Sequence, residues 1–238
     1  MKENKLYQVS TLNALMMGDY EGSVKIKDFL KHADTGIGTF DGLDGEAIFF
    51  EGHAYNGRAT GEVSKMNDED SLPFGCACKF DEKVDEKEIA FDSIEDFKAK
   101  LEKELPSKNY FYIIKMSGVF NVRVRSCFKQ NKPYEPLYKV ACDQREFEYH
   151  EIKGHVIGLY CPNYVEGINL PGWHIHFLSK DLTKGGHILK VSSSDAKFKV
   201  NKLNEWCLML PDSKEFASWN LKEDLKEKTE AVEGASKK

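Results

Sequence analysis

A short stretch of strict alternation constrains the fold more than any other part of the sequence. Between Trp173 and Phe177 every second residue is apolar, and the two residues between them are His174 and His176. A period of two is typical of a β-strand with one buried face, so both imidazoles point to the same side. A Gly-Gly step follows, and His187 then opens a second apolar run. The pattern predicts a hairpin that gathers the three histidines, with cross-strand Cβ atoms roughly 5 Å apart.

These three histidines predict a metal site. A single histidine is more often a surface or core residue, but three of the chain's 7 histidines lie between residues 174 and 187. Imidazole ligands suit zinc, copper, iron or nickel, so the spacing alone leaves the metal open. Three histidines without a thiolate leave coordination positions for water or substrate. This ligand set therefore favours a catalytic site over a structural one.

Length and composition exclude several classes of protein. A chain of 238 residues can bury about 70–75% of its unfolded surface, in one large domain or two small ones. The net charge of −5 argues against a nucleic-acid partner. No stretch approaches the ~18 apolar residues of a membrane span, and the first residues lack the apolar core of a signal peptide, so we expect a cytoplasmic protein. The 6 cysteines are scattered without a Cys-x-x-Cys pair and are expected to be reduced, mostly buried thiols.

The pattern of turns and apolar runs predicts an α+β fold with more strand than helix. Paired Asp-Gly steps at residues 41–45 separate apolar runs and are hairpin signals. Residues 110–128 form the longest β-like run, and residues 85–105 carry apolar positions near helical spacing. That predicted helix is the only plausible boundary, so we expect two domains with mixed or antiparallel sheets and a few helices, over residues 1–108 and 109–238.

Three further segments each allow a functional and a structural interpretation. Arg123 and Arg125 alternate, so they belong either to a solvated edge of a sheet or to a site in which a guanidinium holds a substrate carboxylate. Glu46 follows a tight Asp-Gly turn and is either a solvated hairpin residue or an acid/base that faces a cleft. Residues 36–40 are glycine-rich but lack the Lys-Ser/Thr of a phosphate-binding loop, so we expect only a turn there.

Taken together, these segments resemble the α-acetolactate decarboxylase family along nearly the whole chain. The most specific block is Pro171–Phe177 (PGWHIHF) with the later Gly-Gly-His187, and it is supported by the glycine-rich block that ends at Glu46. The blocks Lys132–Leu137 (KPYEPL) and Gly154–Gly158 (GHVIG) add to the match. The resemblance implies a sheet-rich, two-domain α+β enzyme that binds zinc and commonly dimerises.

The resemblance also assigns roles to individual residues. Zinc would be held by His174, His176 and His187. Thr39 and Glu46, in the expected N-terminal domain, match a threonine and a glutamate of the family, and Arg125, in the C-terminal domain, matches its arginine. A second family glutamate comes from the extreme C-terminus, where Glu233 in Ala-Val-Glu-Gly is the best match.

The implied reaction is the zinc-dependent decarboxylation of 2-acetolactate (2-hydroxy-2-methyl-3-oxobutanoate) to (R)-acetoin and CO₂, a step of acetoin biosynthesis and butanediol fermentation. Loss of CO₂ leaves an electron pair on carbon, and the neighbouring ketone can accept it as a metal-stabilised enediolate. Arg125 would orient the carboxylate or stabilise charge on the oxygens. Glu46 and Glu233 would ligate or hydrogen-bond the zinc-bound groups and manage protons.

Two other interpretations of the histidines stay open at this point. One is an iron-dependent, cupin-like oxygenase with three histidine ligands, and the other is a non-catalytic zinc-binding module. The identity of the metal and any requirement for oxygen separate the first from a decarboxylase. A non-catalytic module would not require Arg125 or Glu46. In the preferred interpretation the partners are a small 2-hydroxy-3-oxo acid and a second copy of the chain, with no nucleic acid and no membrane.

Overall fold

The computed structural model of the protein describes residues 4–140, 144–222 and 224–234. Its first sheet has seven strands in the order β14-β1-β8-β3-β4-β5-β6. β14 runs parallel to β1, and the other neighbours are antiparallel, so the sheet is mixed. The strands are β1 (Lys5–Val9), β3 (Thr35–Thr39), β4 (Glu46–Phe50), β5 (His53–Gly57), β6 (Val63–Lys65), β8 (Phe74–Cys78) and β14 (Glu205–Met209).

The second sheet is antiparallel and built from long strands. β10 pairs with both β11 and β13, β11 with β12, and β12 with β13, so these four strands close on themselves; β9 extends the pairing along β13. The strands are β9 (Lys87–Phe91), β10 (Phe111–Cys127), β11 (Gln144–Cys161), β12 (Gly172–Ser179) and β13 (Gly185–Leu203). β2 (Val24–Lys25) and β7 (Ser71–Leu72) form a small separate pair.

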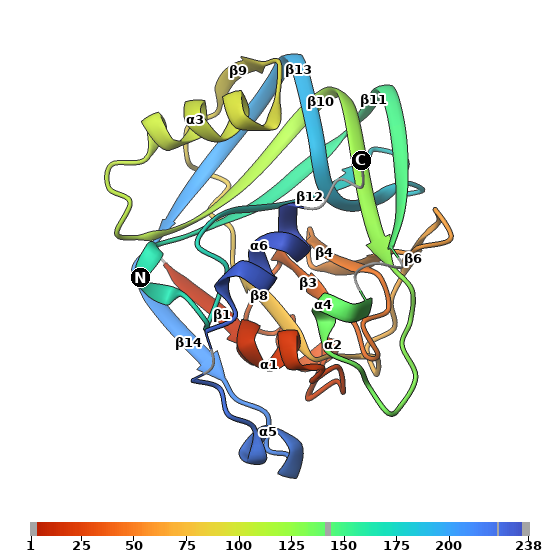
Figure 1. Ribbon diagram of the computed structural model, residues 1–238. Helices are drawn as coiled ribbons and strands as arrows, with labels where there is room; N and C mark the ends of the chain where they lie inside the picture. Colours follow the sequence, from red (N-terminus) through yellow and green to blue (C-terminus); the bar gives the residue numbers. More distant parts are fainter. Residues whose placement is uncertain (1–3, 141–143, 223, 235–238) are drawn as a thin grey trace.

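Helices are few and short. α3 (Ile94–Glu104) lies against β9 and β13, whereas α1, α4 and α6 gather on the other side of the molecule, toward the first sheet (Figure 1). The helices are α1 (Leu12–Met17), α2 (Ile26–Phe29), α3, α4 (Leu137–Val140), the 3₁₀ turn η2 (Asn163–Val165), α5 (Lys214–Ser218) and α6 (Lys226–Gly234). This architecture confirms the predicted sheet-rich α+β class. None of the helices in the described ranges is both long and apolar enough to cross a membrane.

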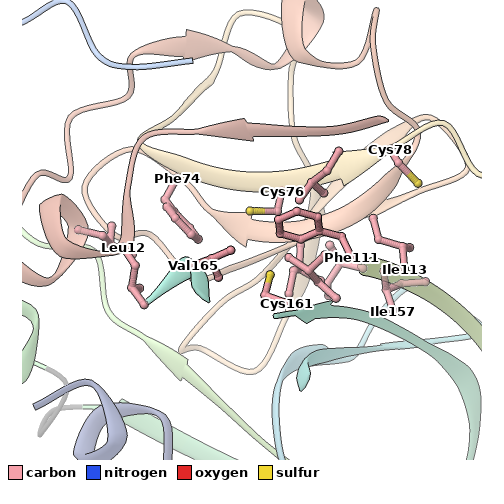
Figure 2. Close-up of a cluster of buried hydrophobic side chains, with 14 of the residues drawn as sticks. Leu12, Phe74, Cys76, Cys78, Phe111, Ile113, Ile157, Cys161 and Val165 are labelled. Atoms are coloured by element: carbon pink, nitrogen blue, oxygen red, sulfur yellow. The ribbon is translucent and has the colours of Figure 1, made fainter. Parts of the chain in front are cut away.

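The two sheets pack face to face around a shared apolar cluster. Ile48 from the first sheet and Ile113 and Ile157 from the second are fully buried in it. Figure 2 shows the centre of the cluster, where Cys76 and Cys161 lie among apolar side chains of β8, β10 and β11. Burial of a side chain of this size contributes about 1.5–3 kcal/mol to stability, so the contact between the sheets is a major source of the fold's stability.

The cysteines agree with the sequence prediction as far as they are described. Cys76, Cys78, Cys127 and Cys161 are free and buried, and Cys207 is free and partly buried. Burial raises the pKa of the Cys76 thiol to about 12, so it is a neutral core residue at pH 7. Cys142 lies outside the described residues.

The helix predicted over residues 85–105 is right only for its second part. Residues 94–104 form α3, whose first turn is capped by the Ser93 hydroxyl, which accepts a hydrogen bond from the Asp96 amide. Residues 87–91 instead form β9, which pairs with β13. Phe91 is buried against Phe97, so the apolar spacing that resembled one long helix belongs to a strand and a helix that pack on each other.

Each sheet includes one strand from the other side of the domain boundary that we expected near residue 108. β9 precedes that position and joins the second sheet, whereas β14 follows it and joins the first. Figure 1 shows blue β14 beside red β1. The division into residues 1–108 and 109–238 stays a prediction, and any two units defined in this way exchange a strand.

We expected a turn in the glycine-rich segment 36–40, but this expectation is wrong. The segment lies in the central strand β3, between β8 and β4. Its glycines allow a close approach of neighbouring backbone. A Cβ atom at Gly36 would lie 2.1 Å from the carbonyl oxygen of Cys76. The absence of a side chain is therefore a packing requirement inside the sheet, which sequence inspection mistook for turn chemistry.

We expect Gly36→Ala to lower the free energy of unfolding by about 1–3 kcal/mol, because the added methyl must push β8 away. Urea titration followed by circular dichroism measures the change. Gly52→Ala is the matched control: its Cβ meets nothing within 4 Å, but its φ of +75° carries a conformational cost. An unfolding midpoint for Gly36→Ala at or above that of Gly52→Ala would contradict the steric argument.

Candidate metal centre

The predicted histidine hairpin is present as β12 and β13. His176 lies opposite His187 in the register, and His174 stands two residues along β12. His174 Nε2 lies 3.1 Å from His176 Nε2 and 3.0 Å from His187 Nδ1. One ligand atom from each of the three residues lies within 4.8 Å of the others. The three imidazoles therefore meet at one point, as the alternation and the Gly-Gly step predicted.

The protonation of these imidazoles fits a metal site. Burial, assisted by the nearby positive charge of Arg125, lowers the pKa of His174 to about 3. The same two causes hold the pKa of His187 well below its usual range. Both rings are thus neutral at pH 7, which is the form that binds a metal.

The orientation of His176 is set from the first sheet. Its Nδ1 lies 2.9 Å from the carbonyl oxygen of Ala47 on β4. Because a carbonyl can only accept, Nδ1 donates, and the lone pair on Nε2 faces the other two histidines. Three imidazole nitrogens that converge in this way fit a divalent cation such as zinc.

Glu46 and Thr39 reach the histidines from the hairpin of β3 and β4, where they oppose each other in the register. A Glu46 carboxylate oxygen, Oε2, lies 3.4 Å from His176 Nε2. The Thr39 hydroxyl donates a 2.8 Å hydrogen bond to the carbonyl of Gly45, the residue just before Glu46. This bond stabilises the turn that precedes Glu46. Thr39 also lines the cavity beside the histidines.

The two alternating arginines have different environments. Arg125 pairs with His187 across β10 and β13, is 3% exposed, and donates from Nη1 to Gln144 Oε1 at 2.9 Å. Arg123 lies at the surface, where it contacts Glu146 and Glu148 at 3.7 and 3.2 Å. Arg123 therefore fits the solvated-edge interpretation, whereas Arg125 is buried beside the histidines, and its role toward a substrate carboxylate stays a prediction.

A small cavity of about 50 Å³ joins these groups. Thr39, Glu46, Arg125, His174 and His187 supply its polar side. The opposite walls are apolar and are formed by Leu12, Leu15, Leu43, Phe74, Leu137 and Val232. A larger groove of about 800 Å³ beside α1 shares Leu12 but contains none of the predicted ligands. Of these two cavities, the small one is therefore the site to which the chemistry points, because it combines imidazoles, a carboxylate and a buried guanidinium.

The last predicted site residue, Glu233, belongs to α6. Its side chain lies outside the part of the chain that the structure describes. The preceding residue, Val232, lines the cavity, so α6 brings the C-terminal segment to the site.

Sequence inspection missed three contributors to this site. Gln144, the Ala47 carbonyl and Cys127, which lines the cavity, have no recognisable local motif. Gln144 could have been found only from the register of β10 and β11, since it lies opposite Cys127, two residues from Arg125.

Comparison with known proteins decides the family. A sequence model described as alpha-acetolactate decarboxylase matches residues 6–223. The chain belongs to this family. It is 36% identical to the alpha-acetolactate decarboxylase of Brevibacillus brevis, over 92% of this chain and 77% of that protein. It is also 36% identical to the Methanosarcina mazei alpha-acetolactate decarboxylase, over 96% of this chain and 80% of that one.

Solved structures agree with the alpha-acetolactate decarboxylase assignment. The crystal structure of alpha-acetolactate decarboxylase from Bacillus subtilis strain 168 matches with a TM-score of 0.93 at 33% identity, covering 97% of this chain and all of that one. A Staphylococcus aureus protein of unknown function, similar to alpha-acetolactate decarboxylase, matches with a TM-score of 0.89 at 30% identity, covering 96% of this chain and 98% of that one. These findings confirm the predicted resemblance and fold class, and the prediction that the chain is a carboxy-lyase.

Proposed function

We propose that this protein catalyses the zinc-dependent decarboxylation of 2-acetolactate to (R)-acetoin and CO₂. The observation that carries the proposal is the meeting of three histidines with Glu46 and Arg125 at one cavity, in a chain that belongs to the alpha-acetolactate decarboxylase family. The family supports the reaction, and the donor set supports the metal. Neither the oxygenase nor the non-catalytic module accounts for the family match together with the buried guanidinium.

Each group has a separate task in this reaction. The three histidines would hold zinc, which would supply a Lewis acid for the electron pair left by CO₂. Arg125 binds and orients the departing carboxylate. The apolar walls exclude bulk water, so the charges of Arg125 and Glu46 act in a poorly screened environment.

A proton must return to the carbon that loses CO₂. Glu46 lies beside His176 at the start of β4, and Glu233 belongs to α6, so the two candidate carboxyl groups come from elements far apart in the sequence. We propose that these two glutamates share the proton transfers. Delivery of the proton from one fixed direction gives a single enantiomer of acetoin.

The decisive experiment measures acetoin from racemic 2-acetolactate with purified protein, before chelator treatment, after it, and after zinc is restored. We expect activity only in the metal-containing samples, with a single acetoin enantiomer by chiral chromatography. Absence of acetoin from protein shown to contain zinc would refute the proposal. Loading with iron and following oxygen uptake then tests the oxygenase alternative directly.

We expect Glu46→Gln to bind zinc normally but to lose about two to four orders of magnitude in kcat, because an amide cannot carry the proton. Steady-state kinetics with metal analysis measures both properties. Glu62→Gln removes an exposed carboxylate near the same sheet and serves as the control. If the Glu46 variant kept wild-type kcat, Glu46 would have no part in proton transfer.

A homodimer and a cytoplasmic location stay predictions of the sequence analysis. Analytical ultracentrifugation of the purified protein tests the first. A species of twice the 27.2 kDa chain mass is the expected result.

A further inference from the structure

We propose that Gln144 is a positioning residue for the reaction: its neutral amide fixes the Arg125 guanidinium without placing a further negative charge beside the substrate carboxylate. The proposal rests on the proposed function, since that function assigns the substrate carboxylate to Arg125. The proposal concerns the effect of a neutral side chain at position 144 beside Arg125. A measurement of anion binding alone can also test this effect.

The contact between the two side chains is buried and well formed. Arg125 Nη1 donates to Gln144 Oε1 at 2.9 Å, and the two residues are 3% and 8% exposed. A hydrogen bond with a charged donor is about twice as strong as a neutral one, and burial removes the competition from water. This bond therefore restricts the plane of the guanidinium, which must align two N–H groups to bind a carboxylate bidentately.

The strand register explains why Gln144 can reach Arg125. β10 and β11 are antiparallel, with Cys127 opposite Gln144 and Arg125 opposite Glu146. Gln144 is thus a diagonal neighbour of Arg125, on the same face of the sheet and within reach of a long side chain. Gln144 also begins β11, so the backbone that places it is held by the strand pairing.

The distribution of charge on these two strands is the second observation. Glu146 stands directly opposite Arg125, yet its carboxylate lies 3.7 Å from Arg123 Nη1, and Arg123 also contacts Glu148 at 3.2 Å. Among the contacts described, Arg123 contacts two carboxylates of β11, and Arg125 contacts the Gln144 amide of the same strand. The arrangement matters because two carboxylates on one guanidinium repel each other, and burial strengthens the repulsion.

Two substitutions of nearly equal size separate the two properties of Gln144. Gln144→Glu keeps the acceptor and adds a charge, whereas Gln144→Met keeps the length and removes the acceptor. Gln130 supplies the matched controls Gln130→Glu and Gln130→Met. It is half-buried in the loop after β10, and its amide donates to the Phe128 carbonyl.

The measurements are zinc per chain, kcat and KM for racemic 2-acetolactate, and the calorimetric Kd of 2-hydroxy-2-methylpropanoate, a simple hydroxy acid used as an anion probe. We expect all four variants to retain one zinc. Gln144→Glu should raise KM and the probe's Kd about 10- to 100-fold through charge repulsion. Gln144→Met should lower kcat about tenfold, with a smaller change in Kd, because the guanidinium is charged but misaligned. The Gln130 variants should stay within about twofold of wild type.

Unchanged Kd and KM in Gln144→Glu would overturn the proposal. So would equal losses in both Gln144 variants with reduced zinc, since these indicate a merely structural role. Wild-type protein that binds the probe but makes no acetoin would refute the proposed function alone, because the comparison of Kd values still tests Gln144. Active wild-type protein with a normal Gln144→Glu variant would refute the Gln144 proposal alone.

Discussion

His174→Ala should remove the bound metal and lower acetoin formation by three orders of magnitude or more, on the order expected when a Lewis acid is lost. His174 is the central histidine of the cluster, because its Nε2 lies 3.1 Å from one histidine and 3.0 Å from the other. Alanine there leaves two imidazoles, which hold a catalytic metal poorly. Metal analysis by mass spectrometry and the acetoin assay measure the two effects on the same sample.

The control for this variant is His53→Ala. His53 is an exposed histidine at the start of β5, and its substitution should change neither zinc content nor rate. Circular dichroism of both variants checks that the fold is intact. Full zinc occupancy in His174→Ala would show that the three-histidine cluster is not the metal site.

Arg125→Lys should retain zinc but lose about 100-fold in kcat/KM, because a lysine ammonium cannot form the two parallel hydrogen bonds of a guanidinium. Its charge is preserved, so the neutral state of His174 and His187, to which Arg125 contributes, should persist. Steady-state kinetics with zinc analysis tests both statements.

Arg123→Lys provides the internal comparison two residues away on the same strand. Arg123 contacts surface carboxylates, and exposed ion pairs of this kind contribute about 0–1 kcal/mol. Its replacement should leave the kinetics near wild type. If the two variants behaved alike, Arg125 would have no special place in the mechanism.

The local part of the metal centre could be predicted from sequence. Alternation around His174 and His176 and the Gly-Gly step before His187 are short-range signals, and strand geometry turns them directly into a shared face. The hairpin that they predict is the one found. The alternation carried that information because Trp173, Ile175 and Phe177 pack into one apolar cluster while the histidines lie on the other face of β12. The two strands also follow each other in the chain.

The long-range part could not be derived in the same way. The Ala47 carbonyl that orients His176 lies 129 residues away in sequence, and no periodicity encodes that distance. Glu46 and Arg125 were brought to the histidines only by the family resemblance, because each alone also fitted a solvated residue. Gln144 was missed altogether, since its role depends on a strand register.

Local rules failed where packing replaced them. The glycines of residues 36–40 signal a turn in most contexts, but here they allow β3 to approach β8 closely. The apolar spacing of residues 85–105 predicted one helix, but these residues form a strand and a helix. Phe91 on the strand and Phe97 on the helix pack against each other. In both cases the structure depends on a contact with another element, which a rule based on neighbouring residues in the sequence does not consider.

The parallel pairing of β1 with β14 has a consequence for synthesis on the ribosome. Residues 5–9 are made before residues 205–209, which are their partners on that side. At about 5–20 residues per second, the nascent chain exposes one flank of β1 for ten seconds or more before its partner is made. Contacts of such sequence separation also slow folding after release. The unpaired flank of β1 is therefore a segment on which we expect a chaperone to act during synthesis.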